Sequence, residues 1–190
     1  MKVGVLALQG DFREHIKAAR ECGHLAMEVR RASELSEIDA LILPGGESTT
    51  IIHLAQSFDL YEPIKEVIAK GLPVYGSCAG MILLADRIVG GIAGQKTFGG
   101  LDITVRRNAF GRQVDSFESD LEFNGASLHA VFIRAPWVEE VGKSVQVLST
   151  AGEHAVAVRE GNLLATSFHP ELTHDLAVHR YFFDEICKGR

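Results

Sequence analysis

Short hydrophobic runs punctuate the first half of the chain. They cover residues 3–8, 25–29 and 40–43, and a fourth run surrounds Val74. Runs that lack strict alternation with polar residues are typical of strands that are buried on both faces of a parallel sheet. We therefore expect these segments to form the strands of one buried sheet.

Segments with helical periodicity separate these runs. Segment 12–19 places its apolar residues on one helix face, between a potential cap at Asp11 and a terminating Gly23. A second helix is expected over residues 61–70. Strands that alternate with helices imply right-handed crossovers and a parallel sheet with helices on both faces. In such a sheet, ligands bind at the carboxyl ends of the strands.

The second half of the chain has a different pattern, with many glycines between residues 90 and 100. After them come short β-rich segments at residues 101–107, 128–133, 145–150, 155–159 and 163–167, and a final helical segment at about 175–188. Short strands with turn signals between them predict that antiparallel strands extend the sheet. No linker-like stretch is present, so residues 1–190 are expected to form a single mixed α/β domain.

Composition narrows the class of protein. The chain has 190 residues, of which 46% are hydrophobic, and its net charge of -6 provides no basic stripe, so no nucleic-acid partner is expected. The first apolar segment is too short for a membrane span and lacks the layout of a signal peptide, which favours a cytoplasmic protein without a membrane partner. Cys22, Cys78 and Cys187 lie far apart, which argues against a zinc site or a disulfide framework.

Candidate chemistry centres on Gly76-Ser77-Cys78-Ala79-Gly80, where an apolar run meets a segment of helical character at residues 81–85. A side chain between two glycines at a strand-to-helix junction is the layout of a nucleophile elbow. There the helix N-terminus favours a thiolate over a thiol. The alternative is a buried structural cysteine, since free cysteine is among the most buried residue types.

Two further segments are expected at strand ends on the same edge. Gln9 and Gly10 follow the first strand, and Gly45 and Gly46 follow the third. Paired glycines let the backbone approach a ligand and present its N–H groups. The segment around Gly45 and Gly46 lacks the spacing of a phosphate-binding loop, which leaves an ordinary turn or an oxyanion loop as its interpretations.

The last strand leads into His169-Pro170-Glu171. In an extended turn, His169 and Glu171 share one side, so that the carboxylate can orient the imidazole as a general base for a cysteine nucleophile. The remaining histidines lack such a carboxylate, and we expect them at the solvated surface: His15, His24, His53, His129, His154, His174 and His179. Asp175 and His179 lack a third metal ligand, so no metal site is predicted.

With these motifs assembled, the chain resembles class I glutamine amidotransferases, which have a Cys, His and Glu triad in that order. The resemblance implies a flavodoxin-like three-layer fold. Further blocks are similar to those of glutaminase subunits of pyridoxal 5′-phosphate synthases and together span nearly the whole chain: residues 8–10, 43–50, 107–118, 132–136 and 167–173. Blocks 107–118 and 132–136 are specific to this subunit family.

The resemblance assigns roles to individual positions. Cys78 would attack the glutamine amide, His169 would transfer the proton, and Glu171 would orient His169. The N–H groups of Gly46 and Ala79 would hold the oxyanion. The family's glutamine-binding positions match Gly46, Glu47, Ser48, Arg107, Ile133 and Arg134. An arginine fork suits the α-carboxylate of the substrate, and the sequence leaves open whether Arg107, Arg134 or neither of them provides it.

The sequence therefore predicts a glutaminase that hydrolyses L-glutamine to glutamate and ammonia without a cofactor or metal. The resemblance implies a partner synthase subunit that uses the ammonia to make pyridoxal 5′-phosphate. Two alternatives remain: a γ-glutamyl hydrolase or thiol peptidase of the same fold, and a redox-sensing relative that is not an enzyme. A redox sensor would not need the His169–Glu171 pair, so this pair counts against it.

Overall fold

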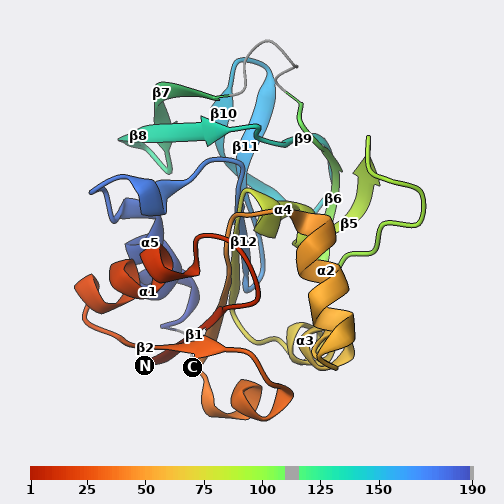
Figure 1. Ribbon diagram of the computed structural model, residues 1–190. Coiled ribbons are helices and arrows are strands. Elements are labelled where there is room, and N and C mark those ends of the chain that lie inside the picture. The colour runs from red at the N-terminus through yellow and green to blue at the C-terminus, as the bar shows by residue number, and fades with distance from the viewer. Residues whose placement is uncertain (110–115, 189–190) are drawn as a thin grey trace.

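The computed structural model describes residues 1–109 and 116–188, and most of its strands form one mixed sheet with helices on both faces (Figure 1). The strands are β1 (Lys2–Leu6), β2 (Leu25–Val29), β3 (Ala40–Leu43), β4 (Val74–Ser77), β5 (Ala85–Val89), β6 (Leu101–Arg106), β7 (Ser116–Phe123), β8 (Ala126–Ile133), β9 (Trp137–Val141), β10 (Gln146–Ala151), β11 (His154–Glu160) and β12 (Leu163–Thr166). The helices are α1 (Phe12–Glu21), α2 (Ser48–Ser57), α3 (Tyr61–Ala69), α4 (Ala79–Leu84) and α5 (Ala177–Tyr181), with 3-10 turns η1 (Ala32–Glu37) and η2 (Pro170–Leu172) and a π-helical turn η3 (Phe182–Ile186). None of these helices is long and apolar enough to cross a membrane.

The order of the strands in the large sheet is β2-β1-β3-β4-β12-β11-β9-β6-β5, and β10 pairs with β11. From β2 to β12 all neighbours are parallel, whereas β12, β11, β9 and β6 pair antiparallel. This order confirms the predicted fold class, a mostly parallel mixed sheet that antiparallel strands extend. The carboxyl ends of β1, β3, β4 and β12 meet at one edge of the sheet, where doubly wound folds bind their ligands.

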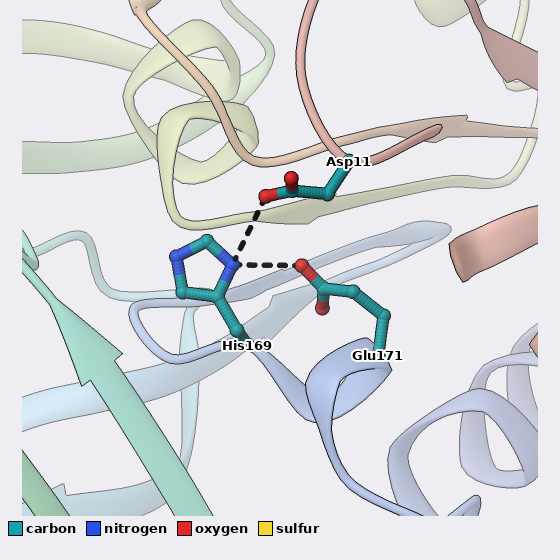
Figure 2. A group of neighbouring side chains, drawn as sticks. All are labelled: Asp11, His169 and Glu171. Carbon is teal, nitrogen blue, oxygen red and sulfur yellow. Dashed lines mark hydrogen bonds and ion pairs between the residues drawn. The ribbon is translucent and has the colours of Figure 1, made fainter. Parts of the chain in front are cut away.

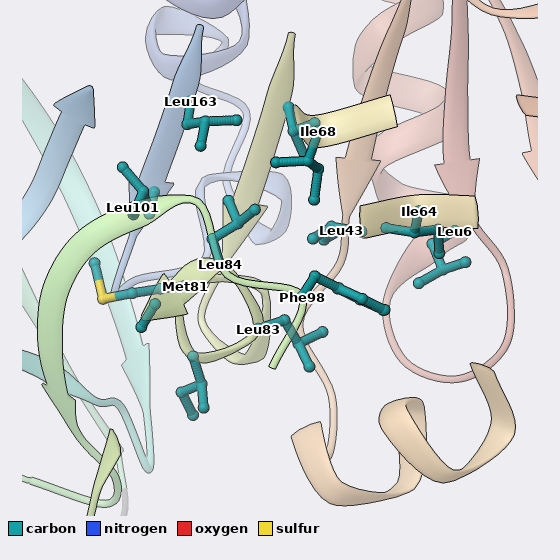
Figure 3. Close-up of a cluster of buried hydrophobic side chains, with 14 of the residues drawn as sticks. Leu6, Leu43, Ile64, Ile68, Met81, Leu83, Leu84, Phe98, Leu101 and Leu163 are labelled. Carbon is teal, nitrogen blue, oxygen red and sulfur yellow. The ribbon is translucent and has the colours of Figure 1, made fainter. Parts of the chain in front are cut away.

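Alternate residues along the central strands bury opposite faces of the sheet. Leu41 and Leu43 of β3 pack into one hydrophobic cluster, while Ala40 and Ile42 pack into the other. Both clusters are buried, which explains why β3 is an unbroken apolar run in the sequence. Helices α2, α3 and α4 cover the first cluster, and α1 and α5 lie on the other face (Figure 1). Met81 and Leu84 of α4 belong to one buried cluster with Leu43, Leu101 and Leu163 of neighbouring strands (Figure 3).

Several elements differ from the sequence prediction. Strands β5, β7 and β9 were not predicted, and β8 pairs with β7 in a separate two-stranded ribbon rather than extending the main sheet. The last helix begins at Ala177 rather than 175, and Asp175 Oδ1 accepts the N–H of Ala177 at 2.8 Å in the turn just before it. Residues 110–115 of the predicted family block 107–118 lie outside the described residues.

Candidate active site

Cys78 lies at the junction of β4 and α4 in a strained backbone conformation, with φ 47° and ψ -100°. The flanking glycines allow this turn, because a Cβ at Gly76 would lie 2.4 Å from the carbonyl oxygen of Gly80. A Cβ at Gly80 would likewise lie 2.3 Å from the carbonyl oxygen of Leu43. Neither position therefore accepts a side chain without moving the backbone. The sequence thus has its glycines where the turn of an elbow requires them.

His169 and Glu171 follow β12 and lie on the same side of their turn. His169 Nδ1 is 2.7 Å from Glu171 Oε1, and both side chains are buried. Burial opposes the charged form of His169, but hydrogen bonds to Cys78 and Glu171 and the charges of these groups raise its pKa to about 10. Burial also opposes the charged form of Glu171, but the nearby His15 and His169 hold the pKa of this carboxyl well below its usual range. The geometry thus favours an imidazolium beside a carboxylate.

Asp11 adds a second carboxylate to this pair. Its Oδ2 lies 3.7 Å from the same Nδ1 of His169, and Figure 2 shows Asp11 and Glu171 approaching that nitrogen from two sides. The side chain of Asp11 makes no capping hydrogen bond to α1, unlike the predicted cap, because it turns toward His169 instead. Burial is the main cause that raises the pKa of Asp11.

These three groups are close enough to share a metal ion, because their potential ligand atoms all lie within 4.8 Å of one another. However, a metal ligand must be deprotonated at the binding atom. His169 has a raised pKa and points Nδ1 at Glu171, so this nitrogen carries a proton that it donates to the carboxylate. The arrangement therefore fits an oriented imidazole better than a metal ligand set.

The glycine loop after β3 packs tightly against the loop after β1. Asp11 N–H donates to the carbonyl oxygen of Gly45 at 3.1 Å, and Glu47 N–H donates to Gln9 Oε1 at 2.7 Å. A Cβ at Gly45 would lie 2.5 Å from Cε1 of His169. Gly46 has φ 150°, and a Cβ there would lie 2.6 Å from Gln9 Oε1. The paired glycines thus let the backbone lie directly against the histidine ring.

A cavity of about 340 Å³ opens above Cys78 and His169. Each predicted substrate-binding and oxyanion residue contributes to its lining: Gly46, Glu47, Ser48, Ala79, Arg107, Ile133 and Arg134. Glu171 lies behind His169 rather than in the lining. Cys78, Asn108 and Arg134 also line the cavity, and all three have positive φ although they are not glycines. Backbone strain of this kind concentrates at functional sites, which supports this cavity as the site of chemistry.

The two candidate arginines differ in their surroundings. Arg107 donates to Glu47 Oε1 at 2.7 Å and to Gln95 Oε1 at 2.8 Å, and its side chain is only 12% exposed. Gln95 Nε2 in turn donates to Ser48 Oγ at 3.0 Å, and this bond connects the segment between β5 and β6 to the start of α2. Arg134 is exposed at the cavity, and no carboxylate among the described residues pairs with it. Sequence reasoning placed Gln9 at this edge without a role, took Asp11 for a helix cap and missed Gln95, because their roles depend on contacts between distant loops.

The expectation that the other histidines lie at the surface is wrong for His15 and His179. Neither has any exposed surface, and His15 Nε2 lies 3.5 Å from Glu171 Oε2. Helical periodicity in the sequence already indicates that these two side chains face the core. His15 shares the apolar face of α1 with Ile16 and Ala19, and His179 is four residues before Phe183. His53, His129 and His174 are exposed, as expected, whereas His24 and His154 are partly buried.

A mostly parallel mixed sheet of this order, with an elbow cysteine near a His–Glu pair, is the arrangement that the resemblance to class I glutamine amidotransferases predicts. Comparison with solved structures agrees. A structure described as a glutamine amidotransferase matches with a TM-score of 0.92 and 50% identity, covering 98% of each chain. The PurLQS structure from Thermotoga maritima shares the fold, with a TM-score of 0.71 and 15% identity over 97% of each chain.

The sequence model of the SNO glutamine amidotransferase family matches residues 5–188, and the chain belongs to this family. A relative from Parafrankia sp. (strain EAN1pec) is 62% identical over 188 residues, which cover 97% of this chain and 93% of the relative. That relative is named pyridoxal 5′-phosphate synthase subunit PdxT. The resemblance seen in the sequence is thereby confirmed.

Proposed function

We propose that the chain is the glutaminase subunit of a pyridoxal 5′-phosphate synthase, hydrolysing L-glutamine to L-glutamate and ammonia. The observation that carries this proposal is that Cys78, at a strained elbow, and His169 line one cavity, with Glu171 bonded to the far nitrogen of the ring. Family membership supports the reaction, and the names of relatives at about 60% identity support the pathway. The proposal treats residues 1–190 as one catalytic domain that works in the cytoplasm.

In the first half-reaction, the Cys78 thiolate attacks the side-chain amide carbon of glutamine and forms a tetrahedral intermediate. Its oxyanion lies between the N–H groups of Gly46 and Ala79. His169, protonated and held by Glu171, gives its proton to the amide nitrogen, the C–N bond breaks and ammonia leaves. The product is a γ-glutamyl thioester on Cys78.

In the second half-reaction, neutral His169 takes a proton from water, and the hydroxide attacks the thioester carbon. The C–S bond breaks, the Cys78 thiolate returns as the leaving group, and glutamate departs. His169 ends the cycle protonated, as it began. Each step moves protons between groups of this chain and the substrate, so the proposal requires no metal or organic cofactor.

Substrate binding follows from the polar groups around the cavity. We assign the α-carboxylate of glutamine to Arg134, because Arg107 already bonds Glu47 and Gln95. Arg107 then holds Glu47, whose carboxylate faces the α-ammonium group of the substrate. Gly46, Ser48 and Ile133 also line the cavity.

Arg134→Met is expected to raise KM for glutamine roughly 10- to 100-fold with a smaller change in kcat. The reason is that a hydrogen bond to a charged group contributes about 1.5–3 kcal/mol. Arg134→Lys should recover part of the loss, since it keeps the charge but not the fork. Arg106→Met is a matched control, because Arg106 pairs with Glu139 outside the cavity. Steady-state kinetics measure all three, and an unchanged KM in Arg134→Met would contradict the assignment.

A diazo-ketone or chloro-ketone analogue of glutamine should label Cys78 well before Cys22 and Cys187. Cys22 ends α1 and Cys187 ends η3, where the helix dipole disfavours a thiolate, and burial raises the pKa of the Cys22 thiol. Peptide mapping after limited labelling would measure the ratio. Equal modification of the three cysteines would count against an activated elbow.

The alternatives are separated by a simple assay. A γ-glutamyl hydrolase or thiol peptidase would cleave γ-glutamyl or peptide substrates while leaving free glutamine intact, and a redox sensor would cleave neither. Ammonia release from L-glutamine, measured with and without a synthase subunit, therefore tests the proposed function directly. Absence of release under both conditions would overturn it.

A further inference from the structure

A chain of buried polar side chains continues from Glu171 into the core. His15 Nε2 lies 2.9 Å from Ser77 Oγ, and His15 Nδ1 lies 3.0 Å from His179 Nε2. Ser77 Oγ donates to Glu171 Oε1 at 3.4 Å, and His15 Nε2 lies 3.5 Å from Glu171 Oε2. His15, Ser77 and His179 have no exposed surface, and none of them lines the cavity. They therefore contact the substrate neither directly nor through solvent.

Proton positions in this chain follow from counting donors. Ser77 has one proton and gives it to Glu171, so at the 2.9 Å contact it accepts the N–H at Nε2 of His15. His15 carries a proton at Nε2 in this arrangement whether the ring is neutral or charged. Burial lowers the pKa of His179 to about 3, with the charge of His15 contributing, so His179 is the neutral end of the chain. The positive end of the His15 N–H bond thus faces the Glu171 carboxylate.

Neighbouring packing fixes the two rings. Tyr75 lies edge-on to both, with ring centroids 5.8 Å from His15 and 5.7 Å from His179. The Tyr75 hydroxyl is itself held at 2.9 Å by Thr166 Oγ1. A ring enclosed in this way cannot turn without disturbing the core, so the N–H of His15 keeps its direction.

We propose that His15, acting through Ser77, is a positioning residue that keeps the Glu171 carboxylate ionised and aimed at His169. A fully buried carboxylate is costly unless donors surround it. His169 supplies one donor at Oε1, and Ser77 supplies a longer second one. Among the described residues, no group makes a hydrogen bond to Oε2, and His15 Nε2 is the cationic-capable group that faces it. The inference rests on the proposed triad and extends it by one residue.

Removing His15 should raise the pKa of Glu171. The folded-state pKa of Glu171 is depressed, so loss of a donor raises it and lets the carboxyl take up a proton at a higher pH. Once Glu171 is neutral, His169 loses its anionic partner, and the thiolate–imidazolium pair is lost with it. The groups that face this carboxyl and titrate are Asp11, His15, Tyr75, His169 and His179. Of the three histidines among them, His15 and His169 lie within 4.0 Å of a Glu171 oxygen.

The test compares His15→Leu, His15→Gln and Ser77→Ala with the wild-type protein. Two quantities are measured: steady-state ammonia release, and the pH profile of Cys78 alkylation by iodoacetamide. We expect His15→Leu to lower kcat roughly 10-fold or more with little change in KM, because general acid–base catalysis of about 10²- to 10⁴-fold depends on the oriented pair. The acid limb of alkylation should move to higher pH. His15→Gln retains an N–H donor and should recover much of both losses.

Ser77→Ala removes the oxygen through which His15 acts while leaving the buried rings in place, and the same upward shift is expected. His24→Leu, at a partly buried histidine that packs on Phe183, is the matched control and should behave as wild type. Wild-type kcat and a wild-type acid limb in Ser77→Ala would overturn the proposal, whatever the folding of the His15 variants. The alkylation profile needs no turnover, so absence of glutaminase activity in the wild type would refute the proposed function alone.

Discussion

Cys78→Ala should abolish glutamine hydrolysis, lowering kcat by about 10⁴-fold or more, and should leave the fold intact. The magnitude follows from the way triad residues act as a unit, so that losing the nucleophile forfeits most of their joint effect. His169→Asn should be nearly as damaging for the same reason. The fold should survive because the Cys78 side chain is small: besides its hydrogen bond to His169, it makes a long contact to the carbonyl oxygen of Ile133 at 3.9 Å. Initial rates of glutamate formation, with circular dichroism on the same samples, measure both expectations.

Cys78→Gly provides a matched control for backbone strain at the elbow. Alanine and cysteine both carry a Cβ at φ 47°, so Cys78→Ala keeps the strain, whereas glycine relieves it. We expect both variants to be inactive, with Cys78→Gly more resistant to unfolding by roughly 1–3 kcal/mol. A Cys78→Ala protein that retained near wild-type turnover would end the thiol mechanism.

Burial on both faces made the first half of the fold predictable from the sequence. Leu41 and Leu43 pack into one hydrophobic cluster and Ile42 packs into the other, so β3 has no polar position. Strand β7 was missed for the opposite reason. Its apolar residues alternate with charged residues at positions 118, 120 and 122, because only one face of the β7–β8 ribbon is buried. Strand β5 was missed because it follows α4 directly at Ala85, with no glycine or proline to mark the change.

The chemistry of the site was predictable where a short motif contains it. The elbow and the His169–Glu171 pair each lie within five residues, so local geometry brings their groups together. Asp11 and His15 contact the same triad although they lie more than 150 residues before His169. No local sequence pattern predicts such a contact. His15 was assigned to the surface on residue type, although its helical position placed it inside.

A second large effect is expected when a synthase subunit is added. We expect the isolated chain to be weakly active, with glutaminase activity rising on the order of 10²-fold as a pyridoxal 5′-phosphate synthase subunit is titrated in. The expectation starts from the chemistry of the product. Free ammonia is protonated and lost in water. Release of ammonia from glutamine is therefore useful only when a synthase receives the ammonia.

The structure suggests how docking would control the rate. The Gly45–Gly46 peptide carries the N–H that is assigned to the oxyanion, and its carbonyl is held only by the N–H of Asp11 at 3.1 Å among the described residues. Rotating this peptide would break one hydrogen bond, a net cost of about 0.5–1.5 kcal/mol, and glycines impose little further barrier. A missing oxyanion donor lowers kcat by about 10²- to 10³-fold. A partner that holds the loop in one orientation would restore that factor.

Steady-state glutaminase assays across a titration of the synthase subunit, with glutamine present, measure this activation, and gel filtration measures the complex. Cys78→Ala serves as the control, because it should co-migrate with the synthase subunit while remaining inactive, which separates docking from chemistry. If partner binding completes the oxyanion hole, the gain must appear in kcat more than in KM, since the donor acts on the transition state rather than on bound glutamine. An unchanged rate together with no co-migration would refute the proposed partnership. Activation confined to KM would instead refute the oxyanion-loop mechanism, because it would mean that docking strengthens glutamine binding and leaves the Gly45–Gly46 peptide as it was.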